Sequence, residues 1–83
     1  MNKQTLSLKV VDIKNLRNSY YGNPNYRLTL EAKNGHTFTA DTMNDYMMNY
    51  GMGYEMKGKD YQFTLKVNKK SNKVLDFKQV EEA

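Results

Sequence analysis

The side chains of this chain that could do chemistry are aromatic and cationic. The only histidine, His36, follows the tight Asn34-Gly35 pair. A side chain there is normally solvated and lacks the orienting partner that a general base needs. The acidic residues are scattered, and residues 51–53 (GMG) lack the lysine and the strand-then-helix context of a phosphate-binding loop. With no cysteine either, we expect no enzymatic activity and no metal or cofactor site.

An aromatic loop is the most unusual short stretch. Residues 18–26 read NSYYGNPNY and place Tyr20 beside Tyr21 in a segment that should be polar, together with the only proline of the chain. Exposed rings can stack on nucleic-acid bases while nearby cations meet the phosphates. Alternatively, one of the two rings packs over the open end of a barrel, with Gly22 and Pro24 merely shaping the turn.

The first element that must position this loop is a strand over residues 5–16. Leu6, Leu8 and Val10 share one face by the period of two. The parity then switches, because Val11 and Ile13 fall on the other face. This switch predicts a bulge or a strong bend, which would let one strand serve two sheets.

The alternating pattern predicts four more strands, over residues 25–33, 36–42, 60–68 and 73–80. Asn34-Gly35 between the second and third strands predicts a hairpin with a type I′ turn. In the last strand we expect Leu75 and Phe77 to point inward. The inward residues expected from the other strands are Tyr26, Leu28, Leu30, Ala32, Phe38, Ala40, Tyr61, Phe63, Leu65 and Val67.

A short helix is predicted between the third and fourth strands. Thr42 and Asp45 resemble a helix-start pair, and glycines at 51 and 53 end the element. A helical face follows from the i, i+3, i+4, i+7 spacing of Met43, Tyr46, Met47 and Tyr50. We expect Met43, Met47 and Tyr50 to be buried.

The resulting order, β-β-β-α-β-β, is that of the OB-fold, a small five-stranded Greek-key barrel. We therefore predict a mainly β, OB-like barrel formed by one domain, residues 1–83, with 79–83 as a frayed tail. An SH3-like barrel, or a sheet with the helix across one face, is the alternative.

In an OB-like barrel the ligand lies on strands 2 and 3 and between the loops that join strands 1–2 and 4–5. Aromatic rings and cations would then converge on one side of the molecule. The residues predicted to bind single-stranded nucleic acid are Arg17, Tyr20, Tyr21, Arg27, Lys33, Lys69, Lys70 and Lys73. The alternative interpretation of the lysines at 69, 70 and 73 is a solvated turn.

A second candidate surface comes from residues 43–56, which hold five of the six methionines and three of the seven tyrosines. So apolar a stretch exceeds what one short helix can bury. Methionine and tyrosine are both common at protein-binding surfaces. An exposed patch would bind a protein partner or a second copy of the chain, so the molecule is a monomer or a homodimer. The predicted protein-binding residues are Met48, Met52, Tyr54 and Met56; the alternative is a plug that fills the end of the barrel.

The overall charge favours acidic partners. The formal net charge is +4 and the computed pI is about 9.3. A surplus of this size attracts polyanions modestly, and it also serves simply to keep a protein soluble. The chain has no apolar run of signal-peptide or membrane-span length, so we expect a cytoplasmic protein that does not contact a membrane.

A set of small uncharacterised bacteriophage proteins resembles this chain from about Leu6 to Phe77. The resemblance lies in the Gly22-Asn23-Pro24-Asn25-Tyr26 turn that enters a strand, the Gly35 hairpin, the threonine-rich strand at 37–41 and a tyrosine-containing helix. It implies a phage or prophage origin, hence the cytoplasm of a bacterial host, and it transfers no activity. Small phage proteins of this kind bind nucleic acid or block a host protein, as anti-CRISPR proteins do. Because inhibitors that mimic DNA are acidic, a basic inhibitor would work through a protein contact.

Overall fold

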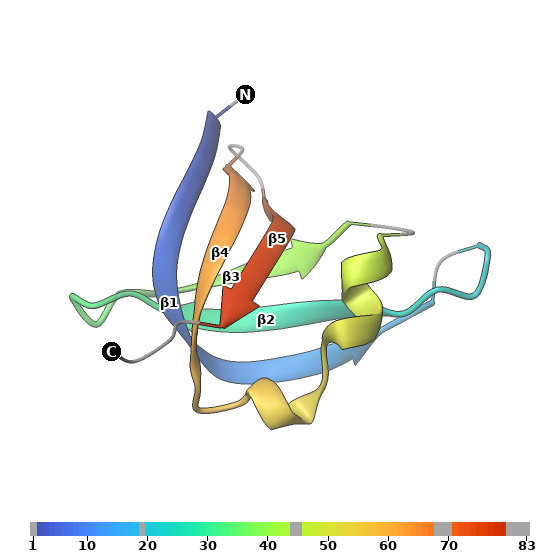
Figure 1. Ribbon diagram of the computed structural model, residues 1–83, viewed down its shortest axis with the longest axis horizontal. Coiled ribbons are helices and arrows are strands. Elements are labelled where there is room, and N and C mark those ends of the chain that lie inside the picture. Colours follow the sequence, from blue (N-terminus) through green and yellow to red (C-terminus); the bar gives the residue numbers. More distant parts are fainter. Residues whose placement is uncertain (1, 19, 44–45, 68–70, 80–83) are drawn as a thin grey trace.

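The computed structural model describes residues 2–18, 20–43, 46–67 and 71–79, which form a closed five-stranded barrel (Figure 1). The strands are β1 (Asn2–Leu16), β2 (Asn25–Glu31), β3 (Thr37–Thr42), β4 (Asp60–Val67) and β5 (Asn72–Gln79). They follow the order β1-β2-β3-β5-β4, and β4 pairs back with β1 to close the barrel. All pairs are antiparallel except β3 with β5. The predicted mainly β, OB-like barrel is confirmed.

The long first strand serves both sides of the barrel, as the parity switch predicts. Residues 2–9 of β1 pair with β4, and residues 9–16 pair with β2. The register with β2 shifts between Val10 and Asp12, which marks a bulge at Val11. The extra residue leaves Val11 outside and lets both Val10 and Ile13 point into the core. The bend therefore comes from the bulge.

The hairpin between β2 and β3 is where the sequence predicts it, but the predicted type I′ turn is wrong. The Gly35 N–H donates to the Ala32 carbonyl at 2.9 Å, and the Ala32 N–H donates to the His36 carbonyl at 2.9 Å. The loop therefore has three residues, with Gly35 at φ +86°. A three-residue hairpin loop needs the left-handed conformation only at its last position, and glycine adopts it without steric cost.

The last strand corrects the prediction for Leu75. Thr64 pairs with Asp76 and Leu65 pairs with Val74, so Leu75 is an extra residue in β5. This bulge places Val74 in the core, whereas Phe77 packs against the core from a partly buried position. The predicted inward position of Phe77 is confirmed, and that of Leu75 is wrong because period-two reasoning does not register a bulge.

The helix predicted between the third and fourth strands is replaced by two short 3₁₀ turns, η1 (Met47–Gly51) and η2 (Tyr54–Met56). Thr42 cannot begin a helix because it lies in β3, where its hydroxyl accepts the Tyr26 N–H at 3.0 Å. Asp45 lies outside the described residues. The predicted burial of Met47 and Tyr50 is also wrong, because both are exposed. A 3₁₀ turn has three residues per turn, so residues spaced at i and i+4 do not lie on one face as they do in an α-helix.

The core fills the barrel and extends under the two 3₁₀ turns. Its buried apolar residues are Leu8, Val10, Ile13, Leu28, Leu30, Ala40, Met52, Met56, Tyr61, Phe63, Leu65 and Val74. Tyr26, Ala32, Phe38 and Val67, all expected to point inward, pack against this core from partly buried positions. In the described part of the chain, no helix is long and apolar enough to span a membrane.

Candidate nucleic-acid interface

The β1–β2 loop, described over residues 17–18 and 20–24, projects from the side of the barrel (Figure 1). It carries two exposed tyrosine side chains. Tyr20 is 96% exposed and Tyr21 is 77% exposed. Their rings meet edge to face, with centroids 5.2 Å apart. Neither ring closes the barrel. Of the two interpretations of this loop, the structure therefore supports the exposed platform.

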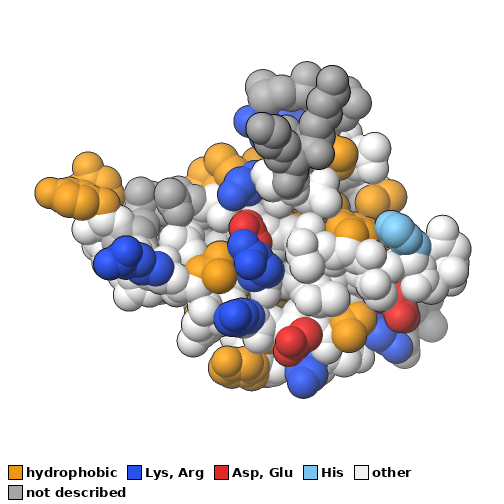
Figure 2. All heavy atoms as spheres, turned by 180° about the vertical axis from the view of Figure 1, so that it is seen from behind, with side chains coloured by type: hydrophobic (Ala, Val, Ile, Leu, Met, Phe, Trp, Pro, Cys, Tyr) orange, Lys and Arg blue, Asp and Glu red, His pale blue; other side chains and the backbone are white. Residues whose placement is uncertain are grey.

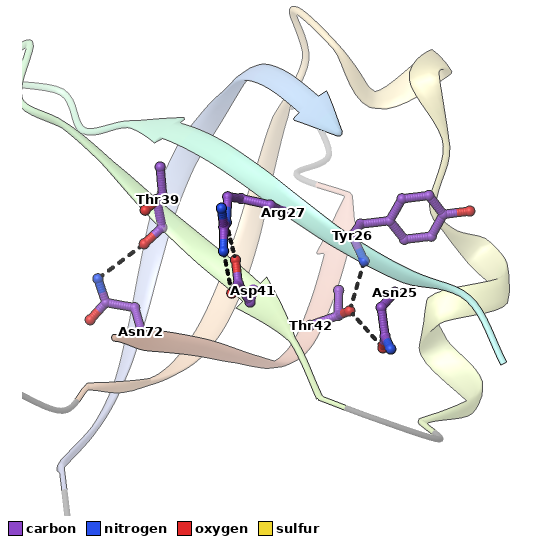
Figure 3. A network of polar contacts seen from close by, with 7 residues as sticks. All are labelled: Asn25, Tyr26, Arg27, Thr39, Asp41, Thr42 and Asn72. Carbon is purple, nitrogen blue, oxygen red and sulfur yellow. Dashed lines mark hydrogen bonds and ion pairs between the residues drawn. The ribbon is translucent and has the colours of Figure 1, made fainter. Parts of the chain in front are cut away.

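A small buried polar network fixes the base of this loop (Figure 3). Asn25, the first residue of β2, donates from Nδ2 to the Arg17 carbonyl at 3.3 Å and accepts from the Thr42 hydroxyl at 3.4 Å. The Thr42 hydroxyl also accepts the Tyr26 N–H. Both Asn25 and Thr42 are buried. Hydrogen bonds within a buried site are costly to break, so they hold the two ends of the loop in place.

The 3₁₀ turn η1 holds the same loop from the other side. Asn49 is fully buried and donates from Nδ2 to the Pro24 carbonyl at 3.0 Å and to the Met43 carbonyl at 2.8 Å. The hydroxyl of Tyr50 donates to Asn23 Oδ1. The residues of the Gly22–Tyr26 turn thus anchor the loop to its neighbours.

On the outer face of the sheet, Arg27 and Asp41 form a two-pronged ion pair across β2 and β3 (Figure 3). The Arg27 Nε lies 2.8 Å from one Asp41 carboxylate oxygen, and the Arg27 Nη2 lies 3.2 Å from the other. The hydrogen bond with Asp41 and then its negative charge raise the pKa of the Arg27 guanidinium, so Arg27 stays charged throughout the usual pH range. Half of the Arg27 side chain faces solvent, which leaves it accessible to an anion.

The structure brings some of the predicted binding residues together and separates another from them. Arg17 is exposed at the base of the tyrosine loop, and Lys73 pairs with Asp41 in register beside Arg27. Lys33 lies in the loop between β2 and β3. Figure 1 shows this loop at the opposite end of the barrel from the β1–β2 loop. Arg27 lies four residues before the end of β2 at Glu31, about 13 Å along the strand, and Lys33 lies beyond that end. Lys33 is therefore not part of the same interface. Lys69 and Lys70 lie outside the described residues.

The predicted protein-binding set is largely wrong. Met52 and Met56 are buried in the core, and Met48 packs against the core from a partly buried position. The alternative of a plug at the end of the barrel holds for Met52 and Met56. Only Tyr54 of the predicted set is exposed. The exposed apolar residues of this region are Tyr46, Met47, Tyr50 and Tyr54.

Strand register adds three cations that sequence reasoning missed, Lys3, Lys14 and Lys66, to the predicted Arg27 and Lys73. Lys14 pairs with Arg27, Asp41 pairs with Arg27 and Lys73, Lys66 pairs with Lys73, and Lys3 pairs with Lys66. We call the five basic residues, Lys3, Lys14, Arg27, Lys66 and Lys73, the cation row. Figure 2 views the molecule from behind and shows a column of Lys and Arg side chains over the barrel, with an acidic side chain among them. The alternation within each strand marks these lysines as outward, but only the pairing of strands places them in one row.

The chain matches no known protein family and no curated protein. Among the residues that the structure describes, no group of three or more histidine or acidic side chains could hold a metal ion.

Proposed function

We propose that this protein binds single-stranded nucleic acid, with Tyr20 and Tyr21 as stacking platforms and the basic outer face of the barrel as the phosphate contact. The observation that carries the proposal is the near-complete exposure of two large rings on a loop with a fixed base. Soluble proteins rarely leave adjacent aromatic side chains in water without a partner for them. Every base offers a ring face, so such a platform accepts many sequences.

The anchored loop base strengthens this proposal. Ordering a loop on binding costs affinity, and a base already held by Asn25 and Asn49 avoids part of that cost. A base stacked on an aromatic side chain contributes about 1–3 kcal/mol. Two such platforms and several phosphate contacts are enough for sequence-tolerant, salt-sensitive binding of a short oligonucleotide.

The test is fluorescence anisotropy of a labelled single-stranded oligonucleotide at low and at moderate salt. We expect the wild type to bind, and its affinity to fall steeply as salt rises, because bound cations release counterions. The double variant Tyr20→Ala/Tyr21→Ala should bind about 30-fold more weakly, the loss of two modest stacks. The matched control, Tyr20→Phe/Tyr21→Phe, keeps both rings and should keep most of the affinity.

Two outcomes would contradict the proposal. Wild-type protein that binds no oligonucleotide even at low salt has no nucleic-acid function of this kind. Binding that survives removal of both rings would leave only a non-specific charge effect, since the basic surface alone attracts any polyanion.

A second function is favoured by a different observation: Met47 is 87% exposed, and Tyr46, Tyr50 and Tyr54 are also exposed on and beside the two 3₁₀ turns. We propose as the alternative a phage-type inhibitor or adaptor that binds a host protein through this Met/Tyr surface. The substitutions Met47→Lys and Tyr54→Lys should then abolish capture of the host protein while oligonucleotide binding stays absent. An apolar contact of this kind should survive salt that removes nucleic-acid binding.

A further inference from the structure

The cation row lies perpendicular to the strands and winds round the barrel. From Lys14 on β1, the paired positions run through Arg27 on β2 and Asp41 on β3 to Lys73 on β5. The row continues to Lys66 on β4 and returns to β1 at Lys3, eleven residues before Lys14. This return at a different height follows from the tilt of the strands in a closed barrel. The cations therefore describe a spiral over a convex surface.

The spacing of the row suits an extended polyanion. Neighbouring strands lie about 4.8 Å apart, so the path from Lys14 to Lys66 is about 19 Å long. Beside it the hydroxyl side chains of Thr29 and Thr39 form the next outward pair on β2 and β3. These groups are neutral hydrogen-bonding partners for a chain that follows the spiral.

Asp41 is the only acidic member of this path, and it sits near the middle. Its two carboxylate oxygens take both prongs of the Arg27 guanidinium, which is the geometry with which arginine also binds a phosphate. Its strand neighbour on the other side is Lys73. An incoming phosphate must therefore compete with Asp41 for Arg27 and also approach a negative charge.

We propose that a single nucleic-acid strand follows the cation row around the barrel, and that Asp41 limits its affinity by holding Arg27 in an internal ion pair. This inference rests on the proposed function and adds to it the path of the ligand and the residue that weakens binding. A duplex is a stiff cylinder and touches a convex spiral over only a few positions, whereas a single strand bends to follow it. The ligand class is therefore single-stranded DNA or RNA.

The first experiment compares Asp41→Asn with Asp60→Asn by anisotropy. Both variants remove one negative charge, from the partly buried Asp41 or from the exposed Asp60. Asp60 pairs with Lys9 at the far end of the barrel and lies about 20 Å along β4 from Lys66. Asp41→Asn should bind the oligonucleotide up to about fivefold more tightly than the wild type, whereas Asp60→Asn should change the affinity by less than about twofold. Equal effects of the two substitutions would overturn the role of Asp41.

The second experiment measures how affinity depends on salt. Each phosphate contact with a single strand contributes about 0.7 to the slope of log affinity against log salt. Lys14→Gln/Lys73→Gln should therefore lower that slope by roughly 1.4. The matched control Lys9→Gln/Lys33→Gln removes the same charge at the other end of the barrel and should leave the slope nearly unchanged. This pair of variants tests the path even where Asp41→Asn is unstable.

The outcomes separate the path from the proposed function. In one outcome, the wild type binds, the tyrosine double variant does not, and the two lysine double variants have equal salt slopes. This outcome overturns the proposed path along the cation row and leaves nucleic-acid binding in place. No wild-type binding overturns both. A duplex of the same sequence that binds as tightly as the single strand also overturns the spiral path, because the curvature argument then fails.

Discussion

The β1–β2 loop and the segment of residues 46–56 are both rich in tyrosine, and they touch each other at Asn23 and Tyr50 and at Pro24 and Asn49. Their relations to the core nevertheless differ. The loop exposes the side chains of Tyr20 and Tyr21 to water, whereas Met52 and Met56 of the segment are buried in the core. The loop is attached to the barrel through its ends, whereas the segment is attached through Met52 at its middle and Met56 at its end.

This difference shows how a small barrel can present aromatic rings without losing its core. The methionines close the mouth of the barrel, so the tyrosines of the loop are not needed there. Methionine suits the closing role because its unbranched side chain adapts to an irregular gap. The loop is then free to carry exposed aromatic rings. The following substitutions test this division of roles between the buried methionines and the tyrosine loop.

The largest expected effect comes from the closing methionines. Met56 is 1% exposed, so Met56→Ala should lower the free energy of unfolding by about 3 kcal/mol through lost burial and a residual cavity. The matched control is Met47→Ala, at a position 87% exposed, which should change stability by less than about 0.5 kcal/mol. Urea denaturation followed by circular dichroism measures both. Similar losses for the two methionines would contradict the division of roles.

Next comes the residue that joins the two regions. Asn49→Ala removes the donor to the Pro24 and Met43 carbonyls in a fully buried site, and should cost about 2 kcal/mol. The same experiment on Asn72→Ala, which removes a solvent-exposed hydrogen bond from a half-buried residue to the Thr39 carbonyl, should cost about 0.5 kcal/mol. An Asn49 variant as stable as the Asn72 variant would mean that the loop base is not held by this hydrogen-bond network.

A smaller effect is expected at the loop tip. Gly22 has φ +80° with no atom near an added Cβ, so Gly22→Ala should cost about 1 kcal/mol from backbone conformation alone. Gly51→Ala is the control, because Gly51 lies in a 3₁₀ turn with an ordinary φ and an added Cβ would make a normal contact with Phe77. We expect the control to alter the thermal midpoint far less. The reverse order would show that the loop tip relaxes freely.

The smallest effect should follow Tyr50→Phe. This substitution removes only the hydroxyl that donates to Asn23 on the surface, which is worth about 0.5 kcal/mol. The proposed platform should respond through a slightly more mobile loop, seen as faster amide exchange of residues 20–23 in solution. Unchanged exchange rates in that loop would show that the buried contacts of Asn49 suffice to anchor it.

Local patterns of the sequence predict much of the barrel. Alternating residues such as Leu28 and Leu30 or Phe63 and Leu65 predict both the strands and their buried faces, because a half-buried strand repeats every two residues. The parity switch at Val10 and Val11 predicts the bend of β1, and Asn34-Gly35 predicts the hairpin. Each of these features depends on neighbours along the chain.

Only the tertiary structure decided the rest, because it depends on which distant residues meet. The base of the loop that carries Tyr20 and Tyr21 is held by Asn49 and Thr42. These residues lie more than fifteen positions from their hydrogen-bond partners, Pro24 and Tyr26. The cation row exists only through the pairing of all five strands. The inward turn of Met52 and Met56 likewise reflects the gap left at the mouth of a closed barrel, which no local period encodes.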